Sequence, residues 1–353
     1  MAQTFTGLTA YMEEQKNRTD FLLDALLGND VLPFIRAAGT FIPDMKEMTR
    51  ALPTLTGTVG IQDGASCSDD FDNGNDTTIG QTTLTVKKAR LQEEYCAHGE
   101  SWETYFTALG LPAGQHAQSE SLGIWQPYLI ADINRRIAKR IAINAWLGNQ
   151  SGDTWTIDGW HDLLLAASIG VYNASSNITG ANVGTTTPTN GGSAGTDAEG
   201  VFNICTSLVT AALSVQQVNG ADFAADIISG NAVIVMSPMN RELMRQNYLK
   251  LGGNDMPEHA PGLAGLQGNT FAAFKMPGHQ ISVVTQNWIP NSTILLVRNG
   301  NLVFGTDLEA DLTALKVWYS EDFDTIRWRS RFKMGMAFRQ LNGLGLKYWG
   351  PTT

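Results

Sequence analysis

The clearest pattern of apolar and polar positions lies near the end of the chain, between residues 325 and 339. Every second position there is largely apolar and most positions between are basic: Ile326, Trp328, Phe332, Met334, Met336 and Phe338 alternate with Arg327, Arg329, Arg331, Lys333 and Arg339. A period of two predicts a β-strand with one apolar face and one strongly basic face. At about 3.3 Å per residue the strand would be roughly 45 Å long, a length that few monomeric enzymes need.

A second periodic segment predicts a long helix over residues 126–147. Apolar side chains recur on one face of this helix at Ile130, Ile133, Ile137, Ile141 and Ala145. Pro127 suits the first turn, and Gly148-Asn149 ends the pattern. At about 1.5 Å per residue the helix would span roughly 33 Å, enough to form the backbone of a domain. A neighbouring face carries four basic residues, which are Arg135, Arg136, Lys139 and Arg140.

The second half of the chain combines helices with short strands. The continuous apolar run over 232–236 is typical of a buried central strand, and helices are expected on either side of it, over 197–217 and 239–249. Further strands are expected over 281–285, 293–297, 302–304 and 315–319. An uncharged segment rich in Gly, Thr, Ser and Asn precedes this region over 173–196 and marks an exposed loop. These elements together predict an α+β fold.

The first hundred residues have little apolar material for a core of their own. An amphipathic helix is expected over 8–27, followed by a proline-punctuated arm over 28–55. Two β-like segments, 54–61 and 82–86, enclose an acidic stretch that contains Asp69, Asp70, Asp72 and Asp76. They predict a long β-hairpin that projects from the body and finds its partners elsewhere.

Composition narrows the range of partners. The net charge is −10, with 34 acidic and 24 basic residues, whereas a dedicated nucleic-acid binder is usually basic. Contact with DNA or RNA is therefore expected to be local or loose. The start of the chain lacks the apolar region of a signal peptide, and the longest uncharged segment is too polar to span a bilayer. We expect a soluble protein made in a cytoplasm, without membrane contact.

The residue patterns of common active sites are missing from the sequence. There is no phosphate-binding loop, no nucleophile elbow and no zinc-binding helix motif, and three cysteines do not suggest a disulfide framework, although Cys67 and Cys96 would meet across a hairpin. Asp307, Glu309 and Asp311 form the best carboxylate cluster, which is more simply read as a solvated or salt-bridged rim than as a cation site. We therefore expect no catalytic residue, no metal, no cofactor and no enzymatic activity.

The order of the elements resembles the Hong Kong 97-type fold of tailed-phage major capsid proteins. Four stretches carry the resemblance: residues 131–149 look like the family's spine helix and its exit, 157–164 like the stretch that leaves this helix, 233–238 like the axial-domain strand and helix, and 301–308 followed by 323–338 like the family's ending. That ending is most similar to capsid proteins of crAss-like and related phages.

The resemblance implies a division of the chain. Residues 1–53 would be the N-terminal arm, 54–99 the extended loop, 100–196 the peripheral domain with spine helix and linker, 197–312 the axial domain, and 313–353 the return strand of the peripheral domain. The implied protein is a structural one that assembles as pentamers and hexamers into the icosahedral head of a virion in the host cytoplasm. Implied partners are a separate scaffolding protein, a portal, decoration proteins and loosely held double-stranded DNA.

The two basic clusters are the candidate contact residues, toward neighbouring subunits or the lumen. Arg135, Arg136, Lys139 and Arg140 on the helix are equally well explained as an ordinary solvated face. Arg327, Arg329, Arg331 and Lys333 on the strand would repel one another without acidic neighbours, and the segment 8–27 and the acidic hairpin tip are candidate partners.

Two alternative functions remain at this point. An encapsulin-like nanocompartment shell would have the same fold and hold a cargo enzyme. A secreted β-rich binding protein or hydrolase belongs to another class and would be a monomer with a pocket.

Overall fold

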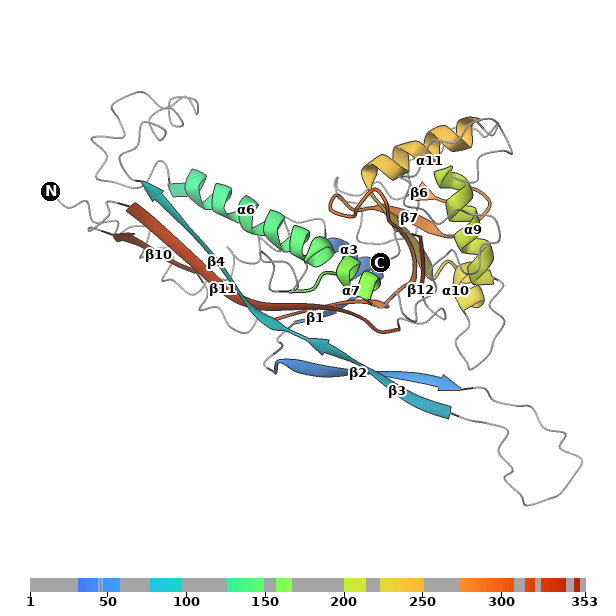
Figure 1. Cartoon of the computed structure of the whole chain (residues 1–353), viewed down its shortest axis with the longest axis horizontal. Coiled ribbons are helices and arrows are strands. Elements are labelled where there is room, and N and C mark those ends of the chain that lie inside the picture. Colours follow the sequence, from blue (N-terminus) through green and yellow to red (C-terminus); the bar gives the residue numbers. More distant parts are fainter. Residues whose placement is uncertain are drawn as a thin grey trace, which may run out of the picture.

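The computed structural model describes residues 31–43, 45, 47–57, 77–96, 126–148, 157–166, 200–213, 223–250, 274–307, 315–320, 325–340 and 346–349. These residues form two five-stranded sheets and a separate two-stranded ribbon (Figure 1). The helix expected over 8–27, the acidic stretch over 69–76 and the linker over 173–196 lie outside the described residues.

The long alternating strand is confirmed as β11, which spans Thr325–Phe338. It pairs antiparallel with β10 along one edge, and with β4 and then β9 along the other, while β1 adds to β9 in parallel. These partners are β1 (Thr40–Ile42), β4 (Lys87–Cys96), β9 (Leu302–Thr306) and β10 (Leu315–Ser320). Three strands thus pair with β11, and a fourth, β1, joins the sheet through β9.

The predicted spine helix is α6, Gln126–Leu147, and it lies along one face of this sheet (Figure 1). Its apolar stripe is buried as expected, with Ile133, Ile137, Ile141 and Ala145 at most 2% exposed. The short helix α7 (Trp160–Ala166) packs beside its end. Trp146, Trp160 and Phe304 form the aromatic centre of the shared core, with ring centroids 5.0 Å and 6.4 Å apart along that series.

The arm over residues 28–55 does contribute to the core, which the sequence analysis did not expect. Residues Val31–Ala38 form helix α3, and Val31, Leu32, Phe34 and Ile35 are all at most 2% exposed. Phe34 packs against Trp146, with ring centroids 6.3 Å apart. Pro33 lies in the first turn, where its missing N–H has no partner to lose. The prolines therefore shape this segment without excluding it from the core.

The second sheet has the strand order β12-β8-β5-β7-β6. Its centre is the predicted apolar strand β5, buried at every position. Odd-numbered Val233 and Val235 face the core shared with α6, whereas Ile234 and Met236 face a second core under helices α9 to α11. The elements are α9 (Val201–Leu213), α10 (Phe223–Ser229), β5 (Ala232–Met236), α11 (Pro238–Lys250), β6 (Phe274–Lys275), β7 (Ser282–Thr285), β8 (Ile294–Arg298) and β12 (Leu346–Trp349).

The expected domain boundary at residues 312 and 313 does not follow the sheets. Strand β9 falls in the range expected for the axial domain, yet it pairs with β1 and β11. Strand β12 falls in the range of the return strand, yet it pairs with β8 of the second sheet. The chain crosses between the sheets at both places, so a cut by sequence range separates paired strands.

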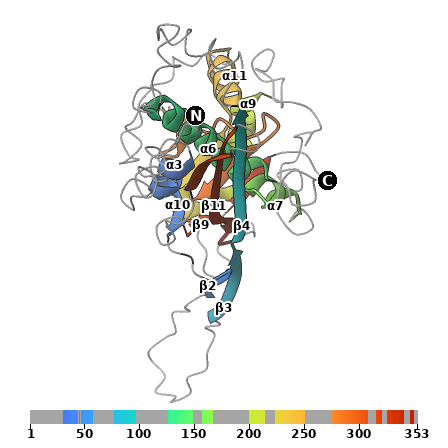
Figure 2. The ribbon, with the colours of Figure 1, turned by 90° about the vertical axis from the view of Figure 1, so that its left-hand side faces the viewer.

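The hairpin expected near residue 54 is an antiparallel ribbon of β2 (Thr49–Gly57) and β3 (Thr77–Thr85), which projects from the body (Figures 1 and 2). A small core that includes Leu52, Leu84 and Val86 fixes its base. After Val86 the chain continues directly into β4. One nearly continuous strand therefore pairs first within the ribbon and then with β11.

The ribbon crosses the first sheet where two glycines face each other, Gly305 on β9 and Gly335 on β11. A Cβ atom on Gly335 would lie 2.2 Å from the carbonyl oxygen of Thr85, and one on Gly305 would lie 2.7 Å from a methyl group of Leu84. Real Cβ contacts are longer than either distance, so position 335, where the neighbouring atoms are backbone, needs glycine, whereas at position 305 the end of a side chain would have to shift.

Candidate interaction surfaces

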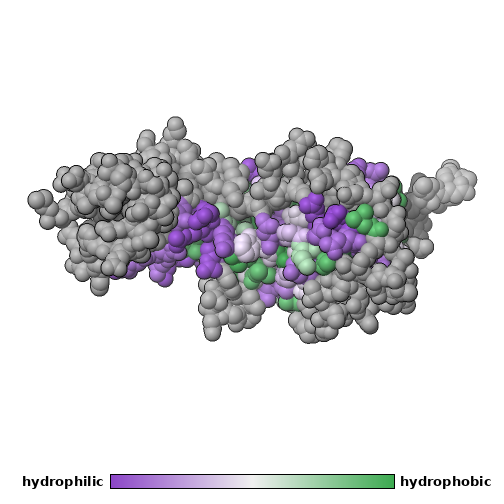
Figure 3. Space-filling view, turned by 90° about the horizontal axis from the view of Figure 1, so that it is seen from above, coloured by the Kyte–Doolittle hydropathy of each residue, from purple (hydrophilic) through white to green (hydrophobic). Residues whose placement is uncertain are grey.

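The four basic residues of α6 are exposed, and each of them interacts with other groups of the chain. Arg135 and Arg136 both contact the carboxylate of Asp132, at 2.6 Å and 2.7 Å. The Lys139 ammonium lies 5.5 Å from the ring centroid of Trp288. On the face seen in Figure 3, hydrophilic side chains gather over the middle of α6. Much of the positive charge predicted for contacts with partners is thus already balanced on the helix itself.

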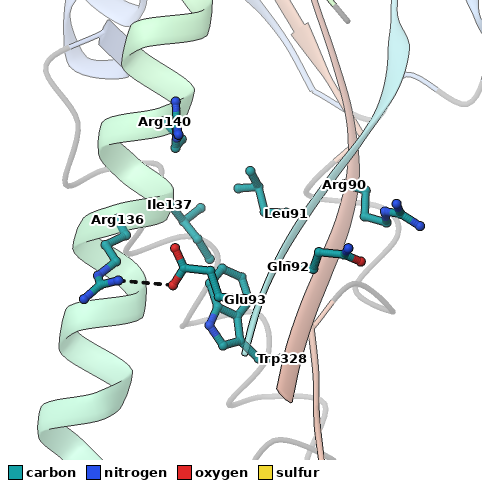
Figure 4. Close-up of a pocket in the computed structure, with 8 residues that line it drawn as sticks. All are labelled: Arg90, Leu91, Gln92, Glu93, Arg136, Ile137, Arg140 and Trp328. Carbon is teal, nitrogen blue, oxygen red and sulfur yellow. Dashed lines mark hydrogen bonds and ion pairs between the residues drawn. The ribbon is translucent and has the colours of Figure 1, made fainter. Parts of the chain in front are cut away.

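Arg136 also joins the helix to the sheet. Its guanidinium lies 3.2 Å from the Glu93 carboxylate on β4, and the two side chains face each other across a groove (Figure 4). Both are partly exposed, so the ion pair stabilises the packing by at most about 1 kcal/mol. The ion pair thus joins β4 to α6 but adds little to stability.

The groove between α6 and β4 has a volume of about 270 Å³. Leu91, Ile137 and Trp328 supply its apolar side, while Glu93, Arg136 and Arg140 supply charged groups. Arg90 and Gln92 reach only its edge, because their side chains point away from the helix (Figure 4). Guanidinium groups beside an apolar surface suit the binding of a carboxylate or phosphate.

On the opposite face of the sheet, the basic side chains of β11 meet carboxylates at two ends. Arg327 makes two contacts with the carboxylate of Glu94 on β4, at 3.1 Å and 3.2 Å. Lys333 lies 3.5 Å from Asp307, which also accepts the Lys333 backbone N–H. These carboxylates belong to the same chain, and the segments expected to supply them, 8–27 and the hairpin tip, lie outside the described residues.

Between these two ends the register brings like charges together. Arg331 lies directly opposite Arg90, and Lys333 lies directly opposite Lys88. Directly opposed residues of an antiparallel pair share a face, so Lys88, Arg90, Arg331 and Lys333 form one group, here named the basic strip. Like charges opposed in this way destabilise a sheet by about 0.2–1 kcal/mol per pair.

The sequence pattern did not identify Lys88 and Arg90 of the basic strip as candidate contact residues. It also did not identify Glu93 and Glu94. The β-like pattern of the hairpin strand ends at residue 86, because the following residues 87–94 are mostly polar. The alternation of Ala89 and Leu91 with Lys88 and Arg90 is the signal that would have extended it. A strand that buries one face needs apolar residues only at every second position.

The expected carboxylate cluster is only partly described. Asp307 is 4% exposed and contacts Lys333, and burial raises its pKa above the ordinary value in spite of that contact. Glu309 and Asp311 lie outside the described residues, as do Cys67 and the side chain of Cys96. Burial raises the pKa of the free thiol of Cys205 to about 12, so this cysteine is an unreactive core residue.

His161 gives the folded chain a sensitivity to acid. Its Nε2 atom is buried and finds no hydrogen-bond partner among the described residues, and burial lowers its pKa below 6.5. The unfolded chain binds this proton at the ordinary pKa, so the stabilisation is complete above pH 6.5 and is lost as the pH falls through the lowered value. His161→Phe should therefore lose less stability than the natural chain between pH 8 and pH 5.

Urea unfolding at both pH values measures this difference. His279→Phe, in the turn between β6 and β7, is the matched control and should behave as the natural chain does. An equal loss of stability in the natural chain and in His161→Phe would contradict the assignment.

The sequence of this chain matches no protein-family model and no curated protein. Solved structures do match it. The capsid of an empty GTA particle has a TM-score of 0.50 and 12% identity, over 90% of this chain and 90% of that chain. The chain has the Hong Kong 97-type capsid fold. Two further matches are the satellite phage P4 procapsid (TM-score 0.47, 10% identity, 96% and 97% covered) and a chain of Mycobacterium phage Adephagia (0.46, 11%, 91% and 90%).

The Hong Kong 97-type fold confirms the resemblance that the order of elements suggested, while a closer likeness to crAss-like phages stays a prediction. Within this fold, the groove and the basic strip lie on opposite faces of the same sheet. The two basic clusters named from the sequence are therefore two separate surfaces, and each is partly balanced by carboxylates of its own chain.

Proposed function

We propose that this chain is the major capsid protein of a tailed phage, a structural protein that assembles as pentamers and hexamers into an icosahedral head around the genome. The observation that carries the proposal is the fold match to a capsid subunit over 90% of both chains. A match of this extent is not confined to one part of the fold.

The ribbon supports an assembled state on physical grounds. Its nine paired positions leave the outer edge of β2 without a strand partner in the described part of the chain. Isolated two-stranded ribbons are marginally stable in water, and open edges invite pairing with other chains. Contacts with neighbouring subunits would give this element the support that its own chain does not.

Each part of the fold is proposed to have the role that the resemblance implies. The segment 1–53 would act as arm, 54–99 as extended loop, and the two sheets as peripheral and axial domains, with β9 and β12 exchanged between them. A separate scaffolding protein, a portal and decoration proteins would be the partners, with loose contact to packaged double-stranded DNA. The site of action would be the virion, after assembly in the host cytoplasm, and no reaction is assigned to the chain.

None of the helices in the described ranges has the length and hydropathy needed to cross a bilayer.

Size-exclusion chromatography of the full chain, followed by negative-stain electron microscopy of the leading fractions, tests this proposal. Closed shells or rings of five and six subunits are the expected result, with or without a co-expressed scaffolding protein. A stable monomer of 38.3 kDa under both conditions would count against an assembly role.

A further inference from the structure

Helix α6 carries an excess of positive charge on an acidic protein. Its 22 residues contain one carboxylate, Asp132, and four exposed cations, which are Arg135, Arg136, Lys139 and Arg140. Arg136 and Arg140 are four residues apart, so their side chains are neighbours on the helix surface, where like charges are destabilising. The same spacing separates Arg135 and Lys139. An anionic partner on this face would turn the repulsion into attraction.

The groove between α6 and β4 is the place where this charge meets apolar side chains. Arg136 and Arg140 line it on the helix side, and Leu91 is partly exposed on the side of β4 (Figure 4). A volume of about 270 Å³ holds a few side chains and not a whole helix, which is about 10–12 Å across. The groove therefore suits a partner that lies over it and carries carboxylates and apolar side chains on one face.

A peptide fits this groove better than a nucleic acid does. Glu93 lines the groove beside Arg136, and Asp132 contacts the same guanidinium from the helix. Both carboxylates would repel a continuous phosphate backbone that followed the groove, and such a backbone would leave Leu91 uncovered. A peptide places single carboxylates against the arginines and covers the leucine with an apolar side chain.

Residues 20–27 of this chain have the required combination. A helix is expected over 8–27, and positions 20, 23, 24 and 27 share one face of such a helix, because they are three or four residues apart. These positions hold Asp20, Leu23, Asp24 and Leu27. The two aspartates have the same spacing as Arg136 and Arg140, so two helices side by side would bring each carboxylate opposite one guanidinium.

The segment is attached to the fold within reach of the groove. Phe34 of α3 packs against Trp146 near the end of α6. Arg140 precedes Trp146 by six residues, which is about 9 Å along the helix. Asp24 precedes Phe34 by ten residues, which span up to about 33 Å when extended. This length also covers the width of a helix, so the segment reaches the groove of its own chain and is held near it at a high effective concentration.

We infer that residues 20–27 dock on the groove of their own subunit, with Asp24 against Arg140 and Asp20 against Arg136. The order of the pairs follows from the attachment. Asp24 is nearer than Asp20 to α3 in the sequence, and Arg140 is nearer than Arg136 to the end of α6 that contacts α3. The two leucines between and beyond the aspartates would cover the apolar side of the groove.

The contacts already made by Arg136 are compatible with this docking. A guanidinium has five N–H donors, so it contacts a further carboxylate while it keeps Asp132 and Glu93. The inference concerns a single subunit and does not depend on the proposed assembly role.

Limited proteolysis of the full chain tests the docking. Chymotrypsin cleaves after aromatic residues, and Phe21 lies inside the docking segment. Cleavage follows the population of undocked segment, so its rate after Phe21, measured by mass spectrometry at low protein concentration, should rise at least about tenfold in Arg140→Glu and in Asp24→Lys. The matched control Arg135→Glu makes the same charge change on α6 outside the groove lining and should stay within about twofold of the natural chain.

A charge exchange separates a direct contact from a general effect of charge. The double variant Arg140→Glu/Asp24→Lys should return the cleavage rate to within about threefold of the natural chain, because the pair is restored with opposite polarity. The milder Arg140→Gln should raise the rate less than Arg140→Glu does. An unchanged thermal midpoint in Arg140→Gln excludes loss of folding as the cause.

Three results would overturn the inference. One is equal cleavage after Phe21 in the natural chain and in Arg140→Glu. Another is protection that increases with protein concentration, which would place the segment on a second copy. The third is binding of a double-stranded oligonucleotide that Arg140→Glu abolishes while cleavage stays unchanged, which would assign the groove to nucleic acid. A natural chain that stays monomeric contradicts the proposed function alone, because the protease experiment still decides the docking.

Discussion

Trp160→Ala is expected to lower the free energy of unfolding by about 3–5 kcal/mol, the usual range for removing a fully buried tryptophan. The side chain is 0% exposed and packs against Trp146 of α6 and Phe304 of β9. Its indole N–H donates to the carbonyl oxygen of Ala337 on β11 at 3.3 Å. One residue therefore ties the spine helix to the two strands at the centre of the first sheet, and alanine would leave a cavity and remove the hydrogen bond to Ala337.

Urea denaturation of the full chain, followed by tryptophan fluorescence and circular dichroism, measures this effect. Trp160→Phe is the matched control, since it keeps most of the apolar volume and loses the hydrogen bond, and it should cost about 1–2 kcal/mol. A loss below 1 kcal/mol in Trp160→Ala would mean that the residue does not connect the helix and the strands in solution.

Gly335→Ala is expected to destabilise the chain by about 3 kcal/mol, at the upper end of the cost of overpacking. The added Cβ would lie 2.2 Å from the Thr85 carbonyl oxygen and 2.9 Å from the Val86 Cα. Both are backbone atoms held by strand pairing, so relief requires the ribbon to lift from the sheet. In this variant, assembly should be lost at a lower urea concentration than the one that unfolds the chain, because the base of the ribbon is displaced before the sheets unfold.

Gly305→Ala is a matched control from the facing position. Its Cβ would meet the end of the Leu84 side chain at 2.7 Å, and the end of a side chain shifts more readily than backbone atoms do. The expected cost is below about 1 kcal/mol for such a shift of a flexible side chain. Equal losses in the two variants, measured by the same urea titration, would show that the crossing is not held by the Thr85 backbone.

The sequence predicted the elements whose periodicity is strong. Residues 126–147 form the expected helix, 232–236 the expected buried strand, and the alternation after 325 a strand of 14 residues. In the helix and the long strand, apolar side chains recur on one face over several turns or pleats, and burial of that face determines both the structure and its orientation. The strand over 232–236 is apolar at every position because both of its faces are buried.

Elements held by tertiary contacts were harder to predict. Strand β4 carries few apolar residues, and its place in the sheet depends on the pairing of Leu91 and Ala89 with β11. Helix α3 has eight residues, contains a proline and becomes stable because Phe34 and Ile35 enter a core built from distant segments. No local pattern encodes these partners.

The same limit applies to the candidate contacts. The sequence identified the basic residues of α6 and β11 and one of the carboxylates that balance them, Asp307. It did not identify the others, which are Asp132, Glu93 and Glu94. Glu93 and Glu94 are adjacent in sequence, yet they face opposite sides of the sheet, one toward Arg136 and the other toward Arg327. Charge alone could not separate the balanced positions from Arg331, because that distinction depends on the register between β4 and β11.

The pairing of β4 with β11 also affects how the chain is made. The ion pair between Glu94 and Arg327 joins residues 233 positions apart. At a synthesis rate of about 5–20 residues per second, β4 leaves the ribosome roughly 12–47 seconds before its partner exists. During that interval its apolar residues and open edge are accessible to other nascent chains. Synthesis of many copies at once therefore requires either a low local concentration of nascent chains or a chaperone that covers β4 until β11 has been made.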